Sequence, residues 1–78
     1  MTEQERKDKS RFVREAVESS GLKYRVIINR LNDDGENVSS STISGILGQY
    51  RRGPKPDRIL CKMETICRDY IAALGKTQ

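Results

Sequence analysis

The sequence predicts an all-α fold, a small bundle of four or five helices. Apolar residues recur at helical spacing along the chain, no two segments alternate as the strands of a hairpin do, and the chain has only 78 residues. A chain of this length removes only about 60–65% of its unfolded-state surface from water, so its core is small. We expect one domain over residues 10–75, a flexible lead-in at residues 1–9 and a tail at residues 76–78.

The first predicted helix begins at Ser10 and ends before Gly21, a C-terminal glycine. Its apolar residues recur at i, i+1, i+4 and i+5 and share one helical face: Phe12, Val13, Ala16 and Val17. Residues 1–9 mix acidic, basic and small polar residues without any apolar period. They are expected to fray or to form an extended arm.

The second segment, residues 22–31, carries an apolar stripe that fits a helix: Val26, Ile27, Ile28 and Leu31. Three consecutive β-branched residues also fit a buried strand. We favour a helix because the segment that follows needs a helical partner. Residues 32–37 are rich in Asn, Asp and Gly, which favours a turn, and they lack the ligand alternation of a calcium loop.

The third predicted helix starts in the run from Ser39 to Thr42, whose hydroxyl side chains are common N-caps, and ends at Gly48. Ile43, Ile46 and Leu47 point inward at helical spacing. An interior glycine costs a helix about 1 kcal/mol relative to alanine. A helix this short with two glycines therefore depends on tertiary packing.

Residues 49–56 contain two prolines and are expected to connect the helices in an extended or turn-like path. Asp57 is the expected N-cap of a last helix over residues 58–74, which Gly75 closes. This helix has the clearest apolar set: Ile59, Leu60, Met63, Ile66, Cys67, Tyr70, Ile71 and Leu74. The spacing of the two cysteines fits neither CxxC nor a common zinc motif, and in a reducing cytoplasm both should be free thiols.

Cys67 lies in the apolar arc of the last helix and is expected in the core, whereas Cys61 lies outside it. Cys61 shares an outer strip with Thr65, Arg68 and Ala72. The small side chains of this strip fit a subunit contact. A partly exposed thiol without a role fits equally well.

Composition argues against an enzyme. The chain has no His, the side chain most often used for proton transfer near neutral pH and a common metal ligand. We expect no catalytic residue, no metal, no cofactor and no small-molecule substrate. No apolar run is long enough to span a bilayer, and the N-terminus is charged where a signal peptide would be apolar. A cytoplasmic protein without a membrane partner is expected.

The positive charge is concentrated in residues 49–58. Four bases and one acid give this stretch three of the four net positive charges of the chain. Arg51 and Arg52 suit phosphates, or one of them a guanine edge. Gln49 suits adenine, and Tyr50 suits a phosphate or a place under the loop. The bases between residues 6 and 14 alternate with acids and are better interpreted as a solvated face than as a DNA-tracking arm.

The stretch from Leu22 to Leu31 followed by VSSSTISGIL resembles the lambda-repressor/Cro-like helix-turn-helix family of phage and bacterial transcriptional regulators. Residues 32–37 make its turn longer than that of the family. The resemblance implies that Tyr24 and Arg25 lie beside backbone phosphates and that Ser39 caps the recognition helix. It also implies that the outer serines of this helix face the major groove: Ser40, Ser41 and Ser44.

We therefore expect a sequence-specific regulator that binds a double-stranded DNA operator as a homodimer and acts by promoter occupancy. The expected location is the nucleoid of a bacterial cell or of a phage-infected host. The candidate DNA-binding residues are Lys23, Tyr24, Arg25, Ser39, Ser40, Ser41, Thr42, Ser44, Gln49, Tyr50, Arg51, Arg52 and Lys55. Two alternatives are a small helical protein-interaction module, such as an antitoxin or a phage inhibitor, and an excisionase-like architectural DNA binder.

Overall fold

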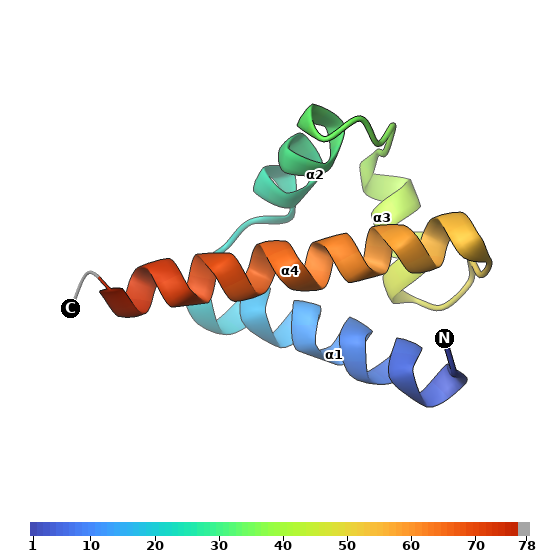
Figure 1. The fold of residues 1–78 in the computed structure, drawn as a ribbon, viewed down its shortest axis with the longest axis horizontal. Helices are drawn as coiled ribbons and strands as arrows, with labels where there is room; N and C mark the ends of the chain where they lie inside the picture. The colour runs from blue at the N-terminus through green and yellow to red at the C-terminus, as the bar shows by residue number, and fades with distance from the viewer. Residues whose placement is uncertain (77–78) are drawn as a thin grey trace.

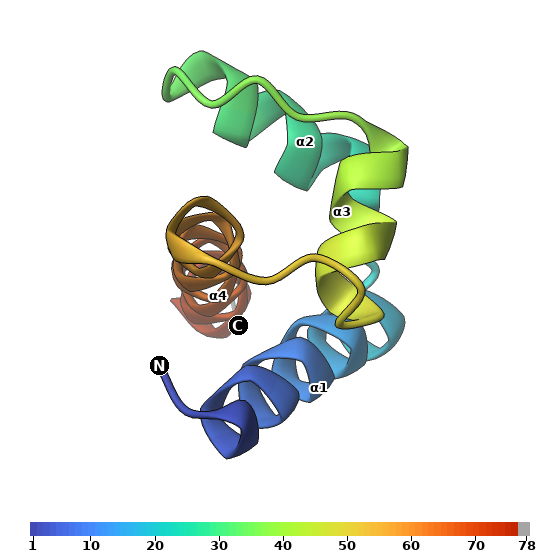
Figure 2. The same cartoon turned by 90° about the vertical axis from the view of Figure 1, so that its right-hand side faces the viewer.

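The computed structural model describes residues 1–76 and confirms an all-α fold, with four helices in that range. They are α1 (Glu3–Ser20), α2 (Tyr24–Asp33), α3 (Ser40–Leu47) and α4 (Pro54–Lys76). Seen along its axis, α4 lies at the centre, and α2, α3 and α1 surround it on three sides (Figures 1 and 2). α1 and α4 run side by side, and α3 bridges the gap between α1 and α2.

The core forms where the apolar faces of the four helices meet around α4. Met63 and Cys67 of α4 are fully buried, as are Ile27 and Leu31 of α2. The remaining core residues come from all parts of the bundle: Val13, Ala16, Leu22, Val38, Ile43, Ile46, Leu47, Ile59 and Leu60. The predicted inward faces of the helices are thus confirmed in their main members.

Three predicted stripe residues are more exposed than expected. Val26 retains 39% of its surface because α2 turns Ile27 and Leu31, one helical turn apart, toward α4. Ile71 and Leu74 are exposed to a similar extent, in the part of α4 that extends past its neighbours (Figure 1).

The expected flexible lead-in at residues 1–9 is wrong, because α1 already begins at Glu3. The Thr2 side chain caps the helix by accepting a hydrogen bond from the Glu5 backbone N–H at 3.1 Å. This first part of α1 has no apolar period because ion pairs, rather than apolar contacts, attach it to α4. Arg6 contacts Asp57 through two bonds of 3.0 and 3.2 Å.

The beginning of the last helix also differs from the prediction. α4 starts at Pro54, and Asp57 lies in its first turn instead of capping it. Proline fits there because the first turn of a helix leaves its N–H groups without intrahelical partners. The C-terminus of α4 passes through Gly75 to Lys76, so the expected end at residue 74 is wrong; residues 77–78 of the expected tail lie outside the described residues.

The connection between α2 and α3, residues 34–39, is fixed by side chains at both ends. The Asn32 amide oxygen accepts a hydrogen bond from the Val38 N–H at 2.9 Å, and its nitrogen donates to the Val38 carbonyl at 3.3 Å. Glu36 is 9% exposed and pairs with Arg58 of α4 through two bonds of 3.1 and 3.0 Å. A turn of this length therefore still sets the position of α3.

These ion pairs predict a loss of stability in acid. The Arg58 guanidinium holds the pKa of Glu36 below its ordinary value of 4.5, and Arg6 holds the pKa of Asp57 below 3.8. Carboxylates with lowered pKa values stabilise the fold above their unfolded-state pKa, and this contribution is lost as the pH falls through the folded-state pKa. Melting followed by circular dichroism should give a midpoint that is steady toward neutral pH and falls below about pH 4.5.

The variant Glu36→Gln should melt at a lower temperature at pH 7 and lose less stability in acid, and Arg58→Gln should behave in the same way. If Glu36→Gln keeps the acid profile of the unchanged protein, this pair does not contribute to it.

Candidate nucleic-acid interface

The outer face of α3 carries small polar side chains. Ser40, Ser41 and Ser44 are exposed, while Ile43 is buried on the opposite side. Ser39 occupies the N-cap position in an extended conformation, as predicted. Its hydroxyl, however, lies 3.2 Å from the hydroxyls of Ser41 and Thr42, and within the described chain no side chain caps the first N–H groups of α3. These amides remain able to donate to a ligand.

A tight turn ends α3 and returns the chain across it. Gly48 is the C-cap, and Gln49 adopts a left-handed conformation with φ 65°. The Tyr50 N–H donates to the Gly45 carbonyl at 2.8 Å, and the Gln49 N–H donates to the Ile46 carbonyl at 3.1 Å. This is the Schellman pattern of a helix C-terminus. It places residues 50 and 51 next to the last turns of α3.

Arg51 lies against the exposed face of α3 at Gly45. A Cβ atom built on Gly45 would come within 2.8 Å of the Arg51 Nε atom. The missing side chain of Gly45 therefore creates the space in which the arginine rests. Arg51 is exposed and has no ion-pair partner within residues 1–76. Its guanidinium is free to contact a ligand that approaches α3.

Two of the other bases of residues 49–58 are held by partners within the protein. Arg52 lies 3.6 Å from the Glu3 carboxylate, and its Nε donates to the Gln49 carbonyl at 3.4 Å. Arg58 is held by Glu36. The predicted cluster of free bases is thus divided, and in the described part of the chain Arg51 and Lys55 are its members without an acidic partner.

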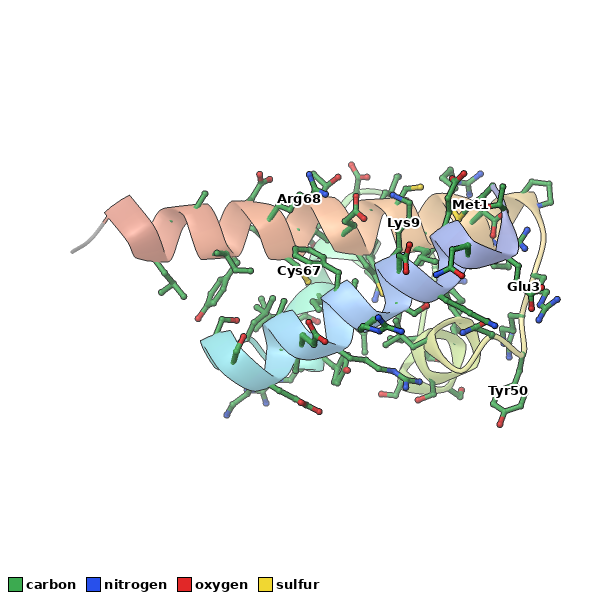
Figure 3. The ribbon with its side chains drawn as sticks, turned by 90° about the horizontal axis from the view of Figure 1, so that it is seen from below. Met1, Glu3, Lys9, Tyr50, Cys67 and Arg68 are labelled. Atoms are coloured by element: carbon green, nitrogen blue, oxygen red, sulfur yellow. The ribbon has the colours of Figure 1, made fainter. Side chains whose placement is uncertain are left out.

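Tyr50 is 88% exposed and points away from the bundle (Figure 3). One edge of its ring lies against Gly48, since a Cβ atom built on this glycine would lie 2.7 Å from a ring carbon of Tyr50. Of its two predicted positions, the one under the loop is wrong. The ring is available to an external partner.

The start of α2 lies beside α3. Tyr24, Ser40 and Ser44 line a hollow of about 360 Å³ between α1, α2 and α3. Burial raises the pKa of the Tyr24 phenol above its ordinary value of 10 and outweighs the opposing effect of Arg14, so the hydroxyl is protonated at neutral pH, as an ordinary phenol is. A protonated phenol donates a hydrogen bond, as a phosphate requires. Lys23 and Arg25, on either side of Tyr24, are exposed.

Arg14 also belongs to this region, although the alternation of acids and bases in the sequence predicts a solvated face for it. Its Nη2 donates to the Leu47 carbonyl at 3.0 Å and so joins α1 to the end of α3. A prediction based on local charge does not identify this contact, because Arg14 and Leu47 are far apart in the sequence. The one relevant signal in the sequence is the spacing of Arg14 from Arg11. Residues three apart share a helical face, so this spacing places the two arginines on the same side of the first helix.

The opposite side of the molecule carries a second groove, of about 600 Å³, between α2 and α4. Its charges are mixed: Arg30, Arg58 and Lys62 face Asp33 and Asp34. Cys61 is exposed in this groove, and Cys67 is buried, as predicted. Burial raises the pKa of the Cys67 thiol.

The described residues contain no group of three or more His, Cys, Asp or Glu side chains placed to hold a metal ion. None of the helices in that range combines the length and apolar character required to cross a lipid bilayer.

Comparison with protein-family models, with curated proteins and with solved structures finds no match to this chain.

Because Arg51 lies against Gly45, we expect Gly45→Ala to change which DNA sequences are bound without lowering the stability of the fold. Alanine is favoured over glycine inside a helix by about 1 kcal/mol, and the atoms it meets belong to a flexible side chain. The melting midpoint should therefore stay the same or rise, by up to roughly 8 °C. The displaced Arg51 should change the set of DNA sequences bound, as measured by selection from a random duplex pool.

The matched control is Gly75→Ala in α4, where an added Cβ meets nothing within 4 Å. It should leave the selected sequences unchanged. An unaltered selection with Gly45→Ala would show that the position of Arg51 does not matter for recognition.

Proposed function

We propose that this protein is a sequence-specific, double-stranded DNA-binding regulator in which α3 enters the major groove. The observation that carries the proposal is the exposed face of α3. Its serines and glycines have small side chains or none, so the helix backbone is accessible, and Arg51 lies against this face at Gly45. A helix fits the roughly 12 Å wide major groove, and small side chains let its backbone approach the bases closely. Mixed-charge surfaces such as the α2–α4 groove lack this match to a polyanion.

The residues divide into two roles on this proposal. Ser41, Ser44 and Arg51 contact base edges, because serine hydroxyls donate and accept hydrogen bonds and arginine binds guanine through two bonds. Phosphates beside the groove are contacted from α2 and from the start of α4: Lys23, Tyr24, Arg25 and Lys55. Phosphate contacts fix the position of the protein, and base contacts select the sequence.

A single α3 offers few base contacts, so the proposal includes a homodimer on a palindromic operator. Two copies of α3 would enter successive major grooves, about 34 Å apart. Regulation would follow from occupancy of a promoter, in the cytoplasm of a bacterial or phage-infected cell. The competing proposal is a small helical module that binds another protein through the α2–α4 groove. It predicts no preference for any DNA sequence.

Arginine substitutions test the base-reading role. Duplexes selected from a random pool are titrated with protein by fluorescence anisotropy, beside scrambled duplexes. Arg51→Ala should weaken binding to the selected duplex by roughly 10- to 100-fold, corresponding to about 1–3 kcal/mol for one base-reading arginine. Arg52→Ala should have a smaller effect because Glu3 and the Gln49 carbonyl hold this side chain. If both variants bind with the affinity of the unchanged protein, residues 51 and 52 do not contact DNA. If no sequence is selected from the random pool, the proposed function is contradicted.

Serine substitutions test the orientation of α3. Ser41→Ala and Ser44→Ala remove hydroxyls that face outward, so the bases preferred at one or two operator positions should change while the melting midpoint stays nearly the same. Ser19→Ala is the matched control, since this exposed serine lies at the far end of α1 and bonds to its own helix. An operator profile that responds to neither α3 substitution would show that this face does not contact bases.

A further inference from the structure

The basic residues of α1 are divided between two sides of the helix. Lys7, Arg11 and Arg14 follow at spacings of four and three residues, which places them in one row. The other two bases of this stretch face α4: Lys9 binds Glu64 at 3.1 Å, and Figure 3 shows its side chain directed toward that helix. Arg6 binds Asp57. In the folded helix, the bases on one side of α1 are therefore paired with acids of α4, and the bases on the other side are not.

The unpaired row meets the end of α3. Lys7, Arg11, Arg14 and Gln49 line a pocket of about 280 Å³ together with Ser10 and Leu47. Arg14 and Leu47 also line the hollow that contains Tyr24 and Ser44. The row therefore continues the surface beside α3 and does not form a separate patch.

The charges in this row are available to a ligand. In the described residues, Lys7 and Arg11 are exposed and have no ion-pair partner, and Arg14 bonds to a neutral carbonyl. Glu15 is the acid that lines the pocket, so cations outnumber it. Ser10 also lines the pocket, and its buried hydroxyl has no hydrogen-bond partner in the same part of the chain. This chemistry suits an anion that carries several charges.

From this arrangement, and resting on the proposed function, we infer that the row of Lys7, Arg11 and Arg14 is a second phosphate-binding surface. It contacts the DNA backbone on the side of α3 where α1 lies. From residue 7 to residue 14 a helix advances about 10 Å, and over this length of the duplex axis one DNA strand presents about three phosphates. The start of α2 and the row on α1 would then hold neighbouring parts of the backbone beside the groove that α3 enters.

The α2–α4 groove provides the contrast that makes the row distinctive. It also contains three bases, but Lys62 is paired with Asp34 at 2.7 Å and Arg58 with Glu36. Pairing with nearby carboxylates reduces the attraction that these bases exert on a distant polyanion. Arg30 of that groove is exposed and has no acidic partner within residues 1–76, so it serves as a single-charge control on the far side of the molecule.

The test is the salt dependence of DNA binding by the full chain. Each phosphate contact contributes about 0.9 to the slope of log K against log salt concentration for B-form DNA. Lys7→Gln and Arg11→Gln should each reduce the slope by about this amount and weaken binding to selected and scrambled duplexes by the same factor. Arg14→Gln should do so too, with a lower melting midpoint because it also loses its bond to Leu47. Arg30→Gln should leave the slope unchanged.

The outcomes separate this inference from the proposed function. If the unchanged protein prefers the selected duplex but Lys7→Gln and Arg11→Gln retain its slope, the row does not contact phosphates while α3 still reads DNA. A slope that falls equally in Arg30→Gln would show a general effect of net charge and would overturn the inference. If the unchanged protein binds no DNA, both proposals fail.

Discussion

The burial of one face of α4 is the constraint on which the other elements depend. α2 and α3 have 10 and 8 residues, fewer than an isolated helix needs to be stable in water, and α3 contains an interior glycine. Both are held because their apolar residues pack against Met63 and its neighbours on α4. The packing of the buried face of α3 thus sets the position of the exposed serines, although the serines themselves are not part of the core.

Charge in this protein has two uses that the sequence alone does not separate. Some bases hold the fold together: Arg6 and Lys9 attach α1 to α4, and Arg58 attaches the turn before α3 to the same helix. Others have no acidic partner within the described chain, and several of these lie around α3, Arg51 among them, whereas Arg30 lies in the α2–α4 groove. Net charge therefore overstates the number of bases available to a partner. Which bases remain free is decided by pairs that form between distant helices.

The sequence predicted the fold class, the inward faces of the helices and the outward serines because each depends on local spacing, such as Ile43 against Ser44. It missed what long-range contacts decide. The helical start of α1 was hidden because its contacts to α4 are polar, and the pairing of Arg58 with Glu36 joins residues 22 positions apart. The place of Arg51 on Gly45 depends on a turn whose left-handed residue is not a glycine. None of these three features has a periodic signal in the sequence.

The turn that ends α3 lowers the stability of the fold, because one of its residues has an unfavourable backbone conformation. Gln49 is the sole non-glycine residue with a positive φ in the described chain, and a left-handed conformation costs an ordinary residue about 1–2 kcal/mol. A chain that needed only to stop α3 would be more stable with glycine there. The amide side chain instead lies where α1 meets the end of α3. At this one position an unfavourable backbone conformation coincides with a polar residue at the junction of two helices, so a glycine there would relieve the backbone and remove the amide group together.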